Sequence, residues 1–306
     1  MKRYFSLTFF FVSLLFAAIA LAQGIVPGPN QNNFDKTQFG TFPDLDQNRD
    51  YAVPWGVVET TWCAPTASAN SVWYFGKGNY PNLLPAGMNN SAIADALITS
   101  LGGLMGTADP NGTTIANTVN GLQTYFNNNY PNTFTVTWNS AFSLPDPFGN
   151  PSAQNLWNWM SSELEKCEDV LPIIWLPFNP GDGSGYQGPP YDNESGEQAV
   201  EQTHLDSCNG HLVTMTGYNW ANPMTINIID PDDNIPAGVH IFPPNVNPVL
   251  WNLALAGNSP QGTALSINNG LGGWIVGAIT ASPIPEPSAL LFIGCSAVLF
   301  ALKRRS

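Results

Sequence analysis

A cysteine at the predicted start of a helix is the residue whose setting most clearly suggests chemistry. The apolar spacing after Trp62 predicts a helix that begins at Cys63 and is stopped by Gly76 and Gly78. Pro65 suits the first turn of that helix, where its missing N–H breaks no hydrogen bond. A thiol at this end faces the positive end of the helix dipole, which favours the nucleophilic thiolate. A buried, inert cysteine is the competing interpretation.

A histidine and an aspartate far downstream supply the other groups that nucleophilic chemistry needs. His211 opens a predicted strand, 211–218, and Asp230 closes the next one, 225–230. The short connection over 219–223 makes these strands an antiparallel hairpin, which brings the two residues side by side. A cysteine nucleophile needs a base within hydrogen-bond reach, and the base needs a third group to fix its tautomer. The spacing therefore predicts that Asp230 orients the imidazole of His211.

Three motifs, taken in chain order, resemble a known family. They are Trp-Cys-Ala-Pro at 62–65, Gly-His-Leu-Val-Thr-Met-Thr-Gly-Tyr at 210–218, and Ile-Asp-Pro at 229–231. The chain resembles papain-like cysteine peptidases, and most closely the bacteriocin-leader-processing, double-glycine peptidase-like type. The resemblance implies that Cys63 is the nucleophile, His211 the general base and acid, and Asp230 the orienting carboxylate. It also implies a papain-like fold, in which an N-terminal helical half packs on an antiparallel β-sheet with the cleft between them.

One feature of that family is missing before the cysteine. Such peptidases usually have a glutamine several residues upstream that donates to the oxyanion, whereas residues 56–61 contain none. The backbone N–H of Cys63 can still donate, and Thr60 or Thr61 could replace the amide. Losing one oxyanion donor costs roughly a hundredfold to a thousandfold in rate.

The order of predicted elements indicates an α+β fold, because helices come first and an antiparallel sheet follows. Helices are predicted over 63–75, 92–101 with Ser91 as cap and Gly102 and Gly103 as stop, 115–126 with Thr113 or Thr114 as cap, and 152–167. Strands are predicted over 134–138, 170–178, 211–218, 225–230, 239–242, 264–267 and 274–279. A long loop is predicted over 179–202, and no internal repeat is visible.

The two ends of the chain have the pattern of export signals. Basic Lys2 and Arg3, an apolar run and the small residues Ala20-Leu21-Ala22 predict a signal peptide over 1–22. Residues 283–306 contain Pro-Glu-Pro, a short apolar segment and Lys-Arg-Arg, and they resemble the PEP-CTERM sorting signal. That resemblance implies removal by an exosortase after transient anchoring in the inner membrane of a Gram-negative bacterium; a plain C-terminal anchor is the alternative.

We therefore expect a protein that is secreted or held in the cell envelope or extracellular matrix. Between the terminal signals we expect an extended or partly disordered surface arm over 23–50 and a papain-like domain over 51–282. The chain has a formal net charge of −13, and five of its nine Lys and Arg lie in the terminal signals. An acidic surface of this kind repels nucleic acid and anionic lipid, so neither is an expected partner of the mature protein. A peptide or protein substrate and an extracellular polysaccharide are the expected partners.

The cysteine count favours one disulfide and one free thiol. Cys295 lies in the terminal apolar segment, which leaves Cys63, Cys167 and Cys208 in an oxidising compartment. If Cys63 is the nucleophile, Cys167 and Cys208 form the pair.

Several residues also suggest metal binding, although no cofactor or metal is expected. Residues 44–50 alternate oxygen ligands as a calcium loop does, but a solvated turn is favoured because the glycine and glutamate of such loops are absent. Residues 230–234 form an acidic turn or a weak calcium site. His204, Cys208 and His211, completed by Cys63 or Cys167, have zinc-like spacing. The competing function is a catalytically inactive, peptidase-like matrix protein that binds polysaccharide or calcium.

Overall fold

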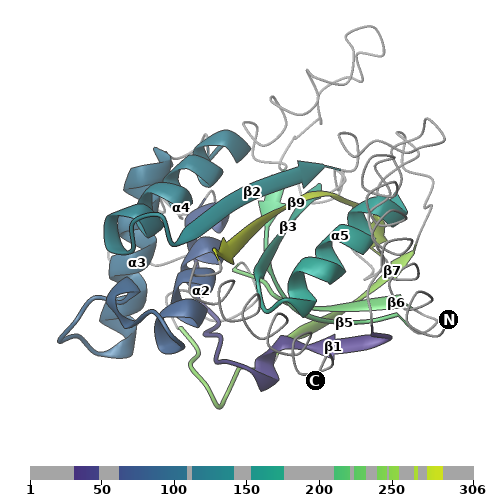
Figure 1. Cartoon of the computed structure of the whole chain (residues 1–306), viewed down its shortest axis with the longest axis horizontal. Coiled ribbons are helices and arrows are strands. Elements are labelled where there is room, and N and C mark those ends of the chain that lie inside the picture. Colours follow the sequence, from purple (N-terminus) through teal and green to yellow (C-terminus); the bar gives the residue numbers. More distant parts are fainter. Residues whose placement is uncertain are drawn as a thin grey trace, which may run out of the picture.

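The computed structural model describes residues 31–47, 62–108, 112–140, 153–175, 210–220, 224–231, 240–246, 248–254, 265–267 and 274–284. These residues form an α+β fold in which helices lie beside a curved antiparallel sheet, as the sequence predicts (Figure 1). The signal peptide, the sorting signal beyond residue 284 and the long loop over 179–202 lie outside the described residues. No helix of the described ranges is long and apolar enough to cross a membrane.

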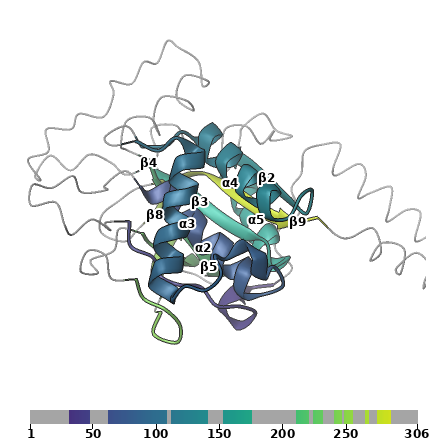
Figure 2. The ribbon, with the colours of Figure 1, turned by 90° about the vertical axis from the view of Figure 1, so that its left-hand side faces the viewer.

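Helices cover both faces of the sheet. The helices α2 (Cys63–Lys77), α3 (Asn90–Met105) and α4 (Ile115–Asn129) gather on one side, which faces the viewer in Figure 2. The helix α5 (Ala153–Glu165) lies within the curve of the sheet (Figure 1). Two short 3-10 helices, η1 (Lys36–Gln38) and η2 (Pro81–Leu83), complete the helical elements of the described ranges.

The strands of the described residues form one antiparallel sheet. They are β1 (Asn33–Asp35), β2 (Phe134–Ser140), β3 (Asp169–Trp175), β4 (Gly210–Leu212), β5 (Thr214–Asn219), β6 (Met224–Ile229), β7 (Val249–Ala254), β8 (Leu265–Ile267) and β9 (Trp274–Pro283). Their order is β1-β5-β6-β7-β8-β9-β3-β4, with β2 paired to β9. Because β3 also pairs with β5, through Val170 and Met215, six of the strands close on themselves as in a barrel.

Two apolar cores lie on the two faces of this sheet. Alternation along β3 divides its side chains between them: Leu171 and Ile173 pack with α2, α3 and α4, whereas Val170 and Ile174 pack with α5. This period-2 division is the expected behaviour of a strand buried on both faces. The helical half and α5 are therefore held by the same strands.

Some predicted strands differ from the structure. The predicted strand 211–218 is divided, because β4 pairs with β3 whereas β5 pairs mainly with β6. The predicted strand 239–242 is wrong: in the described part of it, Ile241 forms only an isolated bridge with Asp44. The strand β7 was not predicted, although Trp251 and Leu253 are buried and alternate with the exposed Leu250 and Asn252.

Both ends of α3 differ from their predictions. Gly76, predicted as a stop, lies inside α2, and α4 ends at Asn129 rather than at 126. The helix α3 begins before Ser91, because Asn89 is its cap and accepts the N–H of Ala92 at 2.9 Å. The predicted stop of α3 at Gly102 is wrong, since the helix continues to Met105 and is capped by Gly106, which has φ +63°. The predicted cap of α4 is confirmed for Thr114, whose hydroxyl accepts the N–H of Asn117 at 3.1 Å.

The described part of the predicted arm, residues 31–47, contains β1 and η1, and much of it is buried rather than laid on the surface. The side chains of Lys36 and Leu45 are fully buried. Asp44 and Asp46 are buried as well, so a solvated turn is the wrong description of the described part of 44–50. The backbone of Asp44 bridges Ile241, and Gln47 donates its N–H to the carbonyl of Pro231 at 3.0 Å. This segment therefore packs against the turn that follows β6.

Candidate active site

The helix α2 places Cys63 at its first position, as the sequence predicts. Trp62 precedes the helix, and its carbonyl accepts hydrogen bonds from the N–H of Thr66 at 3.1 Å and from the Thr66 hydroxyl at 2.8 Å. The rest of α2 through Gly76 is buried, whereas Cys63 is half-buried. The structure therefore presents the thiol at the open end of a fixed helix.

The indole of Trp62 packs directly against the backbone of α3 at Gly102. A Cβ atom built on Gly102 would lie 2.2 Å from Cζ3 of Trp62, far inside contact distance. Glycine is thus the residue that lets the indole reach the helix. Through this contact α3 fixes the residue beside Cys63.

Replacing Gly102 with alanine is expected to destabilise the protein by about 1–3 kcal/mol, because the indole must move. The displaced Trp62 should also change the rate at which iodoacetamide alkylates Cys63. Gly103→Ala is the matched control, because a Cβ there would meet nothing within 4 Å. That control should stabilise the helix by about 0.5–1 kcal/mol. Urea unfolding and thiol alkylation measure both effects, and equal behaviour of the two variants would contradict the packing argument.

The sheet brings His211 and Asp230 together. His211 lies in β4 opposite Ile174 of β3, and Asp230 follows the last residue of β6. The distance from Nε2 of His211 to Oδ1 of Asp230 is 2.5 Å, within hydrogen-bond reach. The predicted juxtaposition of these two residues is therefore confirmed.

The charge state of His211 reflects both neighbours. Burial lowers the pKa of this imidazole, but the carboxylate of Asp230 raises it by charge and by its hydrogen bond. The side chain of Cys63 hydrogen-bonds to the imidazole and raises its pKa further. The net pKa lies well above the ordinary value of histidine. The structure thus brings the three predicted residues, Cys63, His211 and Asp230, into one cluster and favours a protonated imidazole within it.

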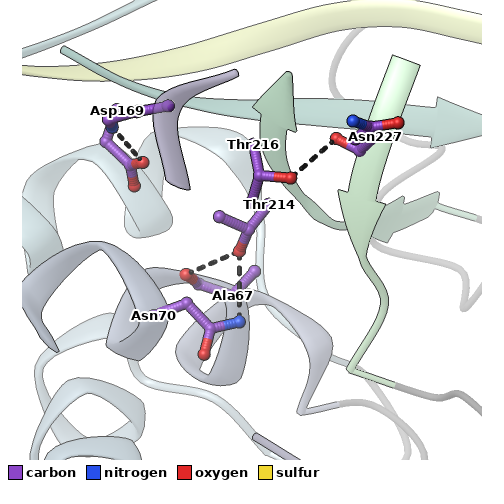
Figure 3. Close-up of polar contacts among 7 residues, drawn as sticks. Ala67, Asn70, Asp169, Thr214, Thr216 and Asn227 are labelled. Atoms are coloured by element: carbon purple, nitrogen blue, oxygen red, sulfur yellow. Dashed lines mark hydrogen bonds and ion pairs between the residues drawn. The ribbon is translucent and has the colours of Figure 1, made fainter. Parts of the chain in front are cut away.

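A small hydrogen-bond network ties the helix of Cys63 to the sheet of His211 (Figure 3). The hydroxyl of Thr214 in β5 donates to the carbonyl of Ala67 at 3.3 Å and accepts from the amide of Asn70 at 3.2 Å. Two residues further along β5, the hydroxyl of Thr216 donates to the carbonyl of Asn227 at 3.3 Å and joins β5 to β6. The two bonds of Thr214 thus fix α2 relative to β5, and the bond of Thr216 fixes β5 relative to β6. Neither Thr214 nor Asn70 was predicted, since a buried polar contact between distant elements leaves no local sequence signal.

The second histidine of the described residues has different partners. Nε2 of His240 lies 3.2 Å from Oδ1 of Asp95, and its Nδ1 accepts the N–H of Asp46 at 3.1 Å. This imidazole joins α3 to the segment 31–47 and serves as an internal comparison for His211.

The described residues contain no group of three or more His, Cys, Asp or Glu that could hold a metal ion. Two of the three zinc candidates, His204 and Cys208, and the upstream oxyanion candidates Thr60 and Thr61 lie outside the described ranges. Cys167 has a free thiol in the structure. Cys208, its predicted disulfide partner, lies outside the described residues. That disulfide stays a prediction.

Comparison with models of known protein families and with curated proteins finds no match to this chain. Its chemistry is therefore inferred from the cluster itself: a thiol at a helix start, an imidazole in contact with it, and a carboxylate hydrogen-bonded to that imidazole.

Proposed function

We propose that this protein is a papain-like cysteine peptidase that hydrolyses a peptide or related acyl bond. The observation that carries the proposal is the shared imidazole: His211 hydrogen-bonds to Asp230 through Nε2 and also hydrogen-bonds to the side chain of Cys63. The arrangement of a helical half against an antiparallel sheet supports the papain-like fold implied by the three motifs.

The proposed reaction uses each group in one role. His211 accepts the thiol proton, and the thiolate of Cys63 attacks the carbonyl carbon to form a tetrahedral oxyanion. The imidazolium then protonates the leaving amine, the C–N bond breaks, and a thioester remains on Cys63. His211 next takes a proton from water, the hydroxide attacks the thioester, and the acid product leaves as the thiol is restored. Asp230 keeps the imidazole oriented and stabilises its positive charge throughout.

The start of α2 supplies part of the oxyanion site in this proposal. The first N–H groups of a helix have no partner within the helix, and that of Cys63 is adjacent to the nucleophile. The second donor is assigned to Thr60 or Thr61, which could substitute for the missing glutamine. Export through the signal peptide and sorting by an exosortase at the C-terminal signal would deliver the enzyme to the envelope or the extracellular matrix.

The competing proposal is an inactive, peptidase-like matrix protein. One feature favours it: residues 56–61 lack the glutamine that assists catalysis in the family. It keeps the fold and the His211–Asp230 pair but predicts no turnover at Cys63.

A thiol-directed acyloxymethyl ketone probe separates the two proposals. An active enzyme should be labelled at Cys63, and it should cleave members of a peptide library in a manner that Cys63→Ala abolishes. Cys167→Ser is the matched control, because it removes the other described free thiol and should keep both activities. Peptide mapping by mass spectrometry identifies the labelled residue. Labelling of Cys167 alone, or cleavage that survives in Cys63→Ala, would contradict the proposal.

A further inference from the structure

A cavity of about 640 Å³ lies over strands β1, β5, β6 and β7, and none of the three triad residues lines it. Its size falls within the range of roughly 300–1,000 Å³ that is usual for small-molecule sites. The triad mechanism does not use this cavity, and its lining differs in character from that of a peptidase nucleophile site.

The floor of the cavity is a row of polar side chains that crosses four strands. Asn33 of β1 pairs with Asn219 of β5, Asn219 pairs with Thr225 of β6, and Thr225 pairs with Asn252 of β7. Directly paired residues project from the same face of a sheet, so these four groups form a transverse row. All four line the cavity.

The neighbouring row contains a glycine that keeps the strands close. Gly217 lies between Asp35 of β1 and Asn227 of β6 in the register. A Cβ atom on Gly217 would lie 2.8 Å from the carbonyl oxygen of Phe34 and 3.1 Å from the Asn227 amide nitrogen. A larger residue would therefore push β1 or the Asn227 amide away, so glycine maintains this part of the floor.

Two exposed apolar side chains also line the cavity. Phe39 is 63% exposed, and its ring stacks on Phe34 with a centroid distance of 5.7 Å and an interplanar angle of 13°. Leu250 of β7 is 59% exposed. The ring of Phe39 is thus held in place by Phe34 while much of its surface stays open to a ligand.

The lining is almost uncharged. Of the twelve described residues that line the cavity, six are Asn or Gln and none is Lys, Arg or His. Its one carboxylate, Asp35, accepts the N–H and the hydroxyl of Thr37 at 3.0 and 2.6 Å and so caps η1. The cavity therefore offers groups that both donate and accept hydrogen bonds, but no cation for an anionic ligand.

We propose that this cavity binds a neutral oligosaccharide. Sugar hydroxyls both donate and accept hydrogen bonds, and amide side chains complement both functions. The C–H face of a sugar ring is apolar and suits the electron-rich face of an aromatic ring such as Phe39. The absence of a cation among the described lining residues disfavours an acidic polysaccharide. This proposal does not depend on Cys63, so the peptidase and the sugar-binding proposals can fail separately.

The test uses the purified Cys63→Ala chain, which cannot turn over a substrate, on an array of neutral oligosaccharides (glucans, mannans and galactans) and acidic fragments of alginate and hyaluronan. Binding to at least one neutral oligosaccharide is expected. Calorimetry with that oligosaccharide should then show affinity losses of roughly fivefold or more for Phe39→Ala and for Asn252→Ala. The matched controls Met88→Ala and Asn128→Ala replace an exposed apolar residue and an exposed amide outside the lining, and should bind as before.

Three results would overturn the proposal. The first is an array that shows no binding or binding to acidic fragments only. The second is neutral-sugar binding that both Phe39→Ala and Asn252→Ala leave unchanged, because the sugar then binds elsewhere. The third is displacement of the sugar by unrelated extended peptides at similar affinity, which would mark the cavity as a peptide site. Circular dichroism of each variant checks that the fold is kept.

Discussion

Replacing His211 with alanine is expected to reduce the proposed hydrolysis by roughly a thousandfold or more, because in the proposed mechanism one imidazole acts as both general base and general acid. Cys63→Ala should remove turnover to the same degree, and the double variant should be no worse than either single one. Such non-additivity is the signature of groups that act as a unit. Steady-state kinetics on a peptide found in the library screen measures all three variants.

The pH dependence of Cys63 alkylation tests the same cluster without a substrate. Although burial lowers the pKa of His211, the charge and hydrogen bond of Asp230 outweigh burial and hold this pKa well above its ordinary value, which favours the protonated imidazole. A positive charge beside the thiol favours the thiolate, and iodoacetamide should therefore modify Cys63 rapidly even at pH 6. In His211→Ala this rapid reaction should disappear, and the rate should rise only toward the ordinary thiol pKa of about 8.5. Identical pH profiles for the two proteins would show that no thiolate–imidazolium pair exists.

Two further variants serve as comparisons for His211→Ala. Asp230→Asn should lower the rate less than His211→Ala, because an amide oxygen can still accept from Nε2 although the stabilising charge is lost. His240→Ala removes the other described imidazole, which also lies beside an aspartate, and should keep the alkylation profile of wild type. A loss of activity in His240→Ala equal to that in His211→Ala, at equal folded fraction, would mean that the triad has been assigned to the wrong histidine.

The parts of the site that could be predicted from sequence are those with local rules. Pro65 and the apolar spacing locate the start of α2, and a short connection forces β5 and β6 to be antiparallel. Once the strands are antiparallel, geometry places His211 near Asp230 without any knowledge of the rest of the fold. The contact with Cys63 needed more, namely the resemblance of the motifs, because nothing local relates α2 to β4.

The parts that could not be predicted depend on distant partners. The sequence predicts Gly102 to be a helix stop. In the structure it lies inside α3, where the indole of Trp62 occupies the space beside it. The strand β1 has three residues and no apolar alternation, and it forms by pairing with residues 217–219 of β5, beyond the point where β5 pairs with β3. The polar sequence around Lys36 indicates a surface position, yet this side chain is fully buried because it forms an ion pair with Asp169. In each case tertiary contacts override a correct local preference.

A buried ion pair links the segment 31–47 to the sheet. Nζ of Lys36 lies 2.9 Å from Oδ1 of Asp169, and both side chains are completely buried. The same ammonium lies 4.0 Å from the ring centroid of Tyr74 on α2 and 5.0 Å from that of Phe42. Burial lowers the pKa of Lys36 and raises that of Asp169, while each charge opposes the shift of the other. Burying the two charges therefore costs free energy, but removing only one of them from the folded protein costs more.

Replacing Lys36 with methionine should destabilise the protein by about 3–5 kcal/mol, since it leaves the Asp169 carboxylate buried without its cation. For a domain of this size that corresponds to a fall of roughly 10 °C in Tm. Lys77→Met is the matched control: Lys77 lies 4.6 Å from the ring centroid of Trp73 but is exposed, and its loss should matter little. Thermal unfolding followed by circular dichroism measures both variants. Equal Tm values for Lys36→Met and Lys77→Met would refute the argument.

The double variant Lys36→Met with Asp169→Leu distinguishes two causes of the lost stability: an unpaired buried charge and lost packing contacts. If the cost of Lys36→Met comes from the stranded carboxylate, removing that carboxylate should recover much of the stability, because apolar replacement of a buried pair is often nearly neutral. If the cost comes from the lost contacts with Tyr74 and Phe42, the double variant should be no more stable than the single one. The segment held by this pair continues to Gln47, which donates to the carbonyl of Pro231 beside Asp230. Lys36→Met should therefore also lower activity at temperatures where it is still folded, and the double variant should restore activity and stability together.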